Sequence, residues 1–463
     1  MRSVLITILI IIILGIVGYV VYAQFFAGEE QISKALKLDP AKEATYLSKV
    51  GDTKGAYFVR MFDVRWNDLE PEKGQFNWEM TDLAAKLAGE EDIYYLSIIW
   101  PYVNWDQDTC HTGARYESER DPEKGGKLKV GKPCDMEAYK SFLTKAVERY
   151  DGDGVDDMPG LKIPVKYWEV LNEPEMQGGS TGGMGEELKF FVGTPEEYLD
   201  ILKASYEVIK AADPDAKVLH AGMAGVQQSF QEFWSPIYKE AANYFDIANV
   251  HTINTDTKRD DLYMIKFKKY LEKYGVKDRP IWITEVQYGE LQEEPKDIEE
   301  FNQLIARSTV FALALGADKL FYIENWLTWG KAKIPEQEGA GKEKIQGEKD
   351  EKAAGPQLME TDPNDPTQKT YLNLVQKINS FGSIETIKEE YKENPADNEG
   401  ASSTIGQYKF VKGDSTIYVL WGKADLPPEI SGRVKITDIY GDVEEIDASE
   451  IKLTGDVIFV EKM

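Results

Sequence analysis

Short apolar runs alternate with longer amphipathic segments from about residue 40 onward. The apolar runs are rich in β-branched and aromatic residues, which is typical of strands buried on both faces of a sheet. Between them, apolar residues recur at spacings of three and four and predict helices, as in Met136–Tyr150 and Ile298–Gly316. The predicted strands are Ala56–Phe62, Ile93–Trp100, Val165–Leu171, Lys217–Gly222, Ile247–His251, Ile281–Thr284 and Lys319–Ile323.

This repeated strand–helix order predicts an α/β fold, specifically a (β/α)8 TIM barrel. No Gly-x-Gly-x-x-Gly follows the first clear strand, which argues against a dinucleotide-binding sheet. One barrel strand is poorly marked. It should precede a helix near residues 41–50, and we expect it to be short or irregular.

The pattern changes at about Ser383. Apolar and polar residues alternate with a period of two through residues 406–422 and 432–447, with short turns between the runs. This pattern predicts a small C-terminal antiparallel β-sandwich. Residues 331–357, before it, are charged and glycine-rich without apolar periodicity, which indicates either a solvated insertion or a lid over the site.

The N-terminus carries an uncharged apolar run from Val4 to Ala23. A run of about 20 residues is long enough to span a bilayer. Arg2 precedes it and Glu29 follows it, which predicts that the remainder of the chain lies outside the cytoplasm. The alternative is a signal peptide that is cleaved after Ala23.

We therefore expect three parts: a membrane anchor or signal segment over 1–27, a barrel over 28–382 and a sandwich over 383–463. The expected location is the cell membrane, as a single-pass protein with an extracytoplasmic catalytic domain. If the first segment is cleaved, the protein is secreted.

Net charge limits the classes of partner, and the number of cysteines limits the possible disulfides. Asp plus Glu number 81 against 54 Lys plus Arg, a formal net charge of −27, which argues against nucleic acid because phosphate binding needs clustered positive charge. The two cysteines, Cys110 and Cys134, flank one predicted loop. Export permits a disulfide between them, which we favour over two unpaired thiols.

We expect no metal and no cofactor. A zinc site is disfavoured because the chain has only three histidines. The segment Asp151–Asp157, with the sequence DGDGVDD, resembles part of a calcium loop. It lacks an oxygen ligand at Val155 and the spacing of a full EF-hand, and we interpret it as a solvated turn.

Two glutamates directly follow predicted strands. Glu173 comes after Val165–Leu171, and Glu285 comes after Ile281–Thr284. A barrel of this kind gathers its reactive groups at the carboxyl ends of its strands. Glycoside hydrolysis needs two facing carboxyl groups, one to protonate the leaving oxygen and one to attack or to activate water.

The stretches around these glutamates resemble those of a known group of enzymes. The sequences YWEVLNEPE, PIWITEVQYG and YIENWLTWG are similar to strands four, seven and eight of glycoside hydrolase clan A. Clan A contains retaining β-glycosidases built on (β/α)8 barrels, and the resemblance covers roughly residues 39–382. The trailing sandwich makes the chain most similar to family 39-like members.

The resemblance implies roles for individual residues. Glu173 matches the acid/base, and Glu285 matches the nucleophile. Asn172 matches the residue that hydrogen-bonds the sugar 2-hydroxyl, Arg60 the arginine that keeps the nucleophile ionised, and Trp326 an aromatic platform for sugar. Because it lies close to the negative charge of the Glu285 carboxylate, Glu173 should have a raised pKa and hold its proton.

One departure from the clan pattern concerns the support of the nucleophile. His251 is present, but Ile253 stands where the clan often has a tyrosine. Tyr288 and Tyr322 are candidate replacements, and the alternative is that Asn254 contacts sugar instead. Trp100 offers an aromatic face for sugar. We therefore add His251, Tyr288 and Trp100 to the expected substrate-binding residues.

The predicted function is a retaining glycoside hydrolase that cleaves β-glycosidic bonds of an oligo- or polysaccharide by double displacement. Two alternatives remain. One is a transglycosylase that uses the same site, and the other is a catalytically silent carbohydrate-binding surface protein.

Overall fold

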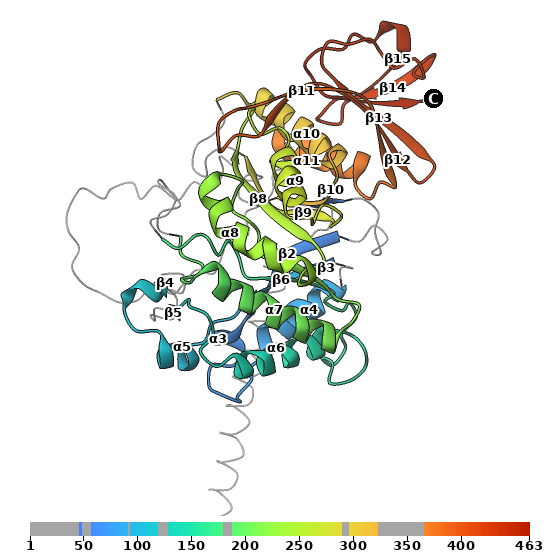
Figure 1. Ribbon diagram of the computed structural model, residues 1–463. Coiled ribbons are helices and arrows are strands. Elements are labelled where there is room, and N and C mark those ends of the chain that lie inside the picture. Colours follow the sequence, from blue (N-terminus) through green and yellow to red (C-terminus); the bar gives the residue numbers. More distant parts are fainter. Residues whose placement is uncertain are drawn as a thin grey trace, which may run out of the picture. The chain divides into compact units, whose positions relative to one another are not determined.

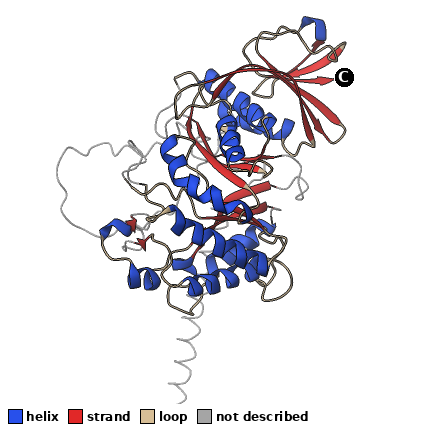
Figure 2. Cartoon of the chain, viewed as in Figure 1, coloured by secondary structure: helices blue, strands red, loops and turns tan. Residues whose placement is uncertain are grey.

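The computed structural model describes residues 46–48, 57–90, 93–118, 128–178, 188–288, 296–322 and 365–463 (Figures 1 and 2). The proposed membrane or signal segment over 1–27 lies outside these ranges, and so do residues 331–357 and Trp326. Among the described residues, no helix has both the length and the apolar character needed to cross a membrane.

Among the described residues, seven strands run parallel around the barrel. They pair in chain order, and isolated bridges between Leu219 and Ile247 and between Met223 and Val250 join the two halves. Each coincides with a predicted apolar run, so the seven strand predictions are confirmed. The strands are β2 (Tyr57–Arg65), β3 (Ile93–Trp100), β6 (Tyr167–Val170), β7 (Lys217–His220), β8 (Ala248–Thr255), β9 (Ile281–Tyr288) and β10 (Ala317–Tyr322).

The remaining strand differs from the expectation. β1 (Tyr46–Ser48) pairs with β10 in the antiparallel sense and also contacts β2. The prediction of a helix near residues 41–50 is therefore wrong for these three residues. A physical reason is that the open edge of β10 needs hydrogen-bond partners, and this tertiary demand outweighs a weak local helical pattern.

Helices follow the barrel strands and turn apolar faces inward. In α7, Thr194 caps the first turn together with Glu197, and Pro195 occupies the first helical position. The helices are α3 (Trp66–Leu69), α4 (Glu79–Glu90), α5 (Asn104–Cys110), α6 (Met136–Tyr150), α7 (Pro195–Ala212), α8 (Gln228–Glu240), α9 (Met264–Lys273), α10 (Ile298–Ala314) and α11 (Pro366–Ile378).

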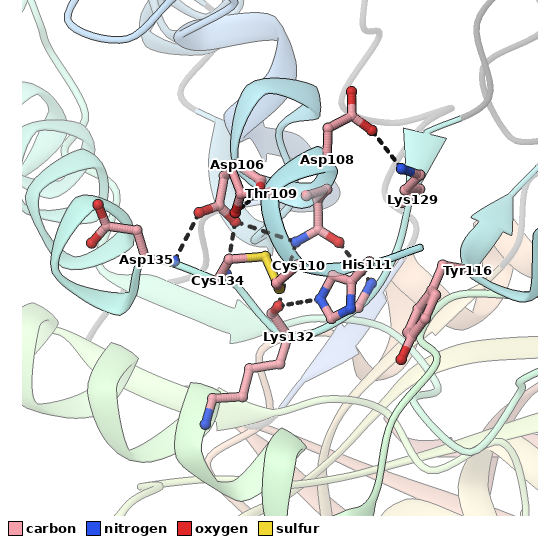
Figure 3. The surroundings of a disulfide bond; sticks show 12 residues. Asp106, Asp108, Thr109, Cys110, His111, Tyr116, Lys129, Lys132, Cys134 and Asp135 are labelled. Carbon is pink, nitrogen blue, oxygen red and sulfur yellow. Dashed lines mark hydrogen bonds and ion pairs between the residues drawn. A yellow bond between two sulfur atoms is a disulfide. The ribbon is translucent and has the colours of Figure 1, made fainter. Parts of the chain in front are cut away.

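The predicted disulfide is confirmed. Cys110, at the end of α5, is bonded to Cys134 across the excursion that carries the short strands β4 (Glu117–Ser118) and β5 (Leu128–Lys129) (Figure 3). The carboxylate of Asp106 accepts the backbone N–H groups of Cys134 and Asp135, each at 2.8 Å. Covalent and polar links therefore hold the base of this excursion together.

The C-terminal part is one antiparallel sheet, so the sandwich prediction is wrong in this respect: all six described strands belong to one hydrogen-bonded sheet. Barrel helix α10 packs against β11 and β12, which supplies cover that a second sheet would otherwise give. Tyr418 and Leu420 face a separate apolar cluster with Ile430 and Ala448. The strands are β11 (Ser383–Glu393), β12 (Ala401–Lys412), β13 (Ser415–Trp421), β14 (Arg433–Thr437), β15 (Val443–Asp447) and β16 (Ile458–Lys462).

An apolar cluster joins five of the barrel strands. Leu96, Leu219, Ile247, Trp282 and Phe321 pack together, and each is almost fully buried. Ile247 lies just before β8 and Trp282 at the start of β9, whereas Leu219 and Phe321 lie toward the ends of β7 and β10. A barrel of this kind positions its functional groups at the carboxyl ends of its strands.

Candidate active site

The two glutamates predicted to react come together at the carboxyl ends of their strands. Glu285 lies in β9, and Glu173 follows the end of β6. One carboxylate oxygen of each, together with a ring nitrogen of His251, lie within 4.8 Å of one another. Strands far apart in sequence therefore bring the predicted pair to one site.

A β-bulge in β9 shapes this site. The pairing of β8 with β9 passes from Val250–Ile283 to His251–Glu285, which leaves Thr284 as an extra residue on β9. Neighbouring residues of a regular strand point to opposite faces. A bulge re-aims side chains, so that Thr284 and Glu285 both contact the same polar network.

Arg60, in β2, connects three of the polar side chains. Its Nη1 lies 2.6 Å from Oε1 of Glu285, and its Nε and Nη2 donate to the two oxygens of Glu169 at 2.7 and 2.9 Å. Its Nη2 also donates to Oδ1 of Asn172 at 2.6 Å. Burial opposes the guanidinium charge, but Glu169 and Glu285 raise the pKa of Arg60 above its ordinary value. The fixed positive charge favours an ionised Glu285.

Glu173 occupies a strained turn. Leu171 has a φ of 70° and Glu173 a φ of 37°, a region that costs a non-glycine residue about 1–3 kcal/mol. The carboxyl group is buried. Burial raises the pKa of Glu173, the negative charge of Glu285 adds to the effect, and the hydrogen bond from His251 opposes it. The turn therefore holds a carboxyl group that retains its proton above the usual pH range.

His251 lies between the two glutamates. Its Nδ1 is 2.7 Å from Oε1 of Glu173 and 3.7 Å from Oε2 of Glu285, and its Nε2 is 2.9 Å from Oγ1 of Thr284. Thr284 donates its hydroxyl hydrogen to Oδ1 of Asn249 at 2.9 Å. The hydroxyl must then accept from Nε2–H, so one proton is shared between Nδ1 and Glu173. Burial lowers the pKa of His251, but the two carboxylates raise it more.

Three residues of this network were not identified as functional from the sequence. They are Glu169, Asn249 and Gly222, none of which lies directly after a predicted strand in a motif that points to chemistry. Glu169 is fully buried and accepts from Nδ2 of Asn249 at 3.0 Å and from the N–H of Gly222 at 3.1 Å. This contact fixes the orientation of the Asn249 amide. A Cβ atom at position 222 would lie 1.9 Å from Nε2 of His251, so only glycine fits there.

A cavity of about 250 Å³ opens beside Glu285. It is lined by Arg60, Asp63, Arg65, Ile98, Trp100, Asn172 and Glu285. A second cavity of about 240 Å³ shares Arg65 and Trp100 with the first and adds apolar side chains that include Tyr102 and Phe190. Trp100 therefore lines both cavities, and the guanidinium of Arg65 lies 5.9 Å from its ring centroid.

Two predicted substrate contacts are not placed at an accessible surface. Tyr288 is fully buried, its hydroxyl lies 2.6 Å from Oγ of Ser308, and its ring stacks on Tyr322. His251 is also fully buried and contacts the glutamates instead of an open cavity. The sequence could not separate these cases because burial of a strand residue depends on what packs against it. Trp326 lies outside the described residues.

Comparison with known proteins is consistent with this geometry. The sequence model of a β-galactosidase family matches residues 164–337, which include both glutamates. The fold resembles a family 39 glycoside hydrolase from the gut symbiont Bacteroides cellulosilyticus WH2, with 15% identity and a TM-score of 0.53 over 88% of this chain and 75% of that one. It also resembles a glucosidase from Croceicoccus marinus, with 12% identity and a TM-score of 0.51 over 86% and 84% of the chains.

A search of curated proteins found no match. The family match spans the strands that carry both glutamates, and the solved structures share the barrel with its C-terminal sheet. The chain is therefore similar to glycoside hydrolases of clan A, through a family match over residues 164–337 and through a fold shared with a family 39 enzyme.

Proposed function

We propose that the chain is a retaining glycoside hydrolase that cleaves β-glycosidic bonds by double displacement. The observation that carries this proposal is the proximity of Glu173 and Glu285, whose oxygens lie within 4.8 Å of each other. Retaining enzymes hold the two carboxyl groups about 5–5.5 Å apart, whereas inverting enzymes need about 6.5–9.5 Å to admit a water molecule. The short separation favours direct attack by one carboxylate.

Glu285 is the proposed nucleophile because it pairs with Arg60 and is the more exposed of the two, with 20% of its side chain accessible against 6% for Glu173. Its carboxylate attacks the anomeric carbon while the bond to the leaving oxygen breaks. Glu173 gives its proton to that oxygen, and the neutral alcohol departs. A glycosyl ester on Glu285 remains.

Water then completes the cycle. The Glu173 carboxylate takes a proton from a water molecule, whose oxygen attacks the anomeric carbon and displaces Glu285 as a carboxylate. Asn172 lines the cavity beside the nucleophile, and its Oδ1 is already engaged by Arg60. Only its amide nitrogen is left to donate, which suits the proposed contact with the sugar 2-hydroxyl.

The experiment measures turnover of aryl β-glycosides and β-linked polysaccharides by the full chain in detergent. Glu285→Gln should lose hydrolysis, while Glu79→Gln, at an exposed acid of α4, should retain it. Glu173→Gln should lose far more activity on substrates with poor leaving groups than on activated aryl glycosides, because only the former need a proton. The anomer released first, followed by NMR, should retain the β configuration.

Three results would count against the proposal. An α-anomer as first product would indicate inversion, equal activity of Glu285→Gln and wild type would place the nucleophile elsewhere, and sugar binding without turnover would favour a silent binding protein. Added acceptor sugars distinguish a transglycosylase, because glycosides of the acceptor would then replace the hydrolysed product.

We further propose that the enzyme acts outside the cytoplasm, held by residues 4–23 or released after Ala23. The Cys110–Cys134 disulfide supports this location, because such bonds persist in oxidising compartments. Cell fractionation, with the protein detected by an antibody to the C-terminal sheet, tests this location. Recovery of the protein in the cytosol with its cysteines reduced would contradict the proposed location.

A further inference from the structure

The loop that leaves α6 gathers three carboxylates that the proposed chemistry does not use. Asp151, Asp153 and Asp157 each offer one oxygen, and these oxygens lie within 4.8 Å of one another. Calcium–oxygen distances are about 2.3–2.6 Å. Two ligand oxygens on opposite sides of one ion are therefore separated by about twice that distance, which is close to the 4.8 Å within which the three oxygens lie. The three carboxylates are therefore close enough to share a single cation.

Asp151 gives the independent observation. The residue is only 1% exposed, and its Oδ2 is buried without a hydrogen-bond partner among the described residues. A buried carboxylate oxygen without a partner carries a substantial desolvation penalty. In the described part of the chain, no lysine or arginine forms an ion pair with Asp151, Asp153 or Asp157.

Nearby charges do not relieve this penalty. Lys166 contacts the backbone oxygen of Asp151 at 2.6 Å, but its ion pair is with Asp213. The carboxylates of Asp153 and Asp157 lie beside Asp151 and add further negative charge. The loop thus concentrates negative charge around a buried carboxylate.

We propose that Asp151, Asp153 and Asp157 bind a calcium ion. The available side chains offer oxygen only, which suits a hard cation. Calcium accepts six to eight oxygens in irregular geometry, so backbone carbonyls and water can complete a site that has three carboxylates. From the sequence, this segment was interpreted as a solvated turn, in part because Val155 offers no oxygen ligand. Backbone carbonyls and water can supply the ligand that is missing there.

The ion would stabilise the entry to β6. The loop connects α6 to β6, the strand that contains Glu169 and leads to Glu173. The N–H of Val165 also bonds the oxygen of Tyr150, which ties the two ends of the loop together. Binding is therefore expected to raise thermal stability, and it does not require that the proposed hydrolysis be correct.

The test titrates calcium into the EDTA-treated full chain in detergent, with calorimetry and thermal unfolding as readouts. We expect one site with a Kd on the order of 10⁻⁴–10⁻³ M, the range of extracellular modules. At 10 mM calcium the Tm should rise by a few degrees, and magnesium should have a smaller effect. Asp157→Asn and Asp153→Asn should each weaken binding about tenfold or more.

Asp156→Asn is the matched control. It removes the same charge from the same loop, its positive φ of 53° tolerates asparagine, and it is not one of the three clustered carboxylates. It should bind calcium like wild type. Absence of a saturable signal in wild type would overturn the proposal, and so would an equal loss in Asp156→Asn, which would indicate general attraction to an acidic surface. If Asp157→Asn does not fold, the exposed Asp153 gives the deciding variant.

Discussion

Glu175 should make the protein less stable as the pH rises, and Glu175→Gln should remove this effect. Its carboxyl group is buried, with Oε1 accepting the N–H of Ala224 at 2.7 Å. Its Oε2 has no hydrogen-bond partner in the described ranges. Burial raises the pKa of Glu175 to about 8, and the nearby charge of Glu173 raises it further in the same direction. Glutamine keeps the shape of the protonated acid and cannot ionise.

The size of the effect follows from the two protonation states. The ordinary glutamate value is 4.5, so between pH 4.5 and 8 the folded protein holds a proton that the unfolded chain releases. The free energy of unfolding then falls with rising pH, by at most about 1.4 kcal/mol per pH unit. Integrated from pH 5 to pH 7, the loss due to this carboxyl group is about 2.5 kcal/mol.

The measurement compares thermal unfolding of wild type and Glu175→Gln at pH 5, 6, 7 and 8. The two should be similar at pH 5, and the variant should become progressively more stable relative to wild type toward pH 8. Comparing the two proteins at each pH cancels the other titrating groups. A stability difference that is independent of pH would refute the reasoning, because it would mean that Glu175 ionises at the same pH in both states.

Three further outcomes follow from the structure. Thr284→Val should lower kcat/KM about tenfold or more and should shift the alkaline limb of its pH profile, because His251 loses the acceptor that sets its tautomer. Thr284→Ser should restore both the value of kcat/KM and its pH profile. Arg60→Lys should lower kcat about 10²-fold at little cost in Tm, because one ammonium cannot reproduce the guanidinium fork. Replacing Cys110 and Cys134 together by alanine should cost about 3 kcal/mol, measured by denaturant unfolding, with unchanged KM.

The barrel could be predicted because its strands are buried on both faces. Strands in that environment have a recognisable sequence pattern, a run of β-branched and aromatic residues, which is why all seven parallel strands were predicted. The two glutamates were found because each directly follows such a run. The disulfide was found from the number of cysteines and the loop between them.

Other features depend on contacts between residues distant in sequence, which produce no local sequence pattern. The direction of β1 is set by the open edge of β10, and the cover of the C-terminal sheet is supplied partly by α10, distant in sequence. The bulge at Thr284 inserts one residue into a strand whose sequence reads as continuous. Trp100 lines a cavity and Tyr288 is buried, although both are aromatic residues at strand ends, because only packing decides which ring is exposed.

The position of His251 explains how one site can serve both proposed half-reactions. Before cleavage the negative charge is on Glu285, and the proton between Nδ1 and Glu173 is available to the leaving group. After cleavage the charge has moved to Glu173, while Glu285 is a neutral ester. Nδ1 is the ring nitrogen that faces Glu173, at 2.7 Å in the resting structure, and it stays beside this carboxyl group through both half-reactions. The Glu173 carboxylate left by the first half-reaction is then the group positioned to take a proton from water in the second.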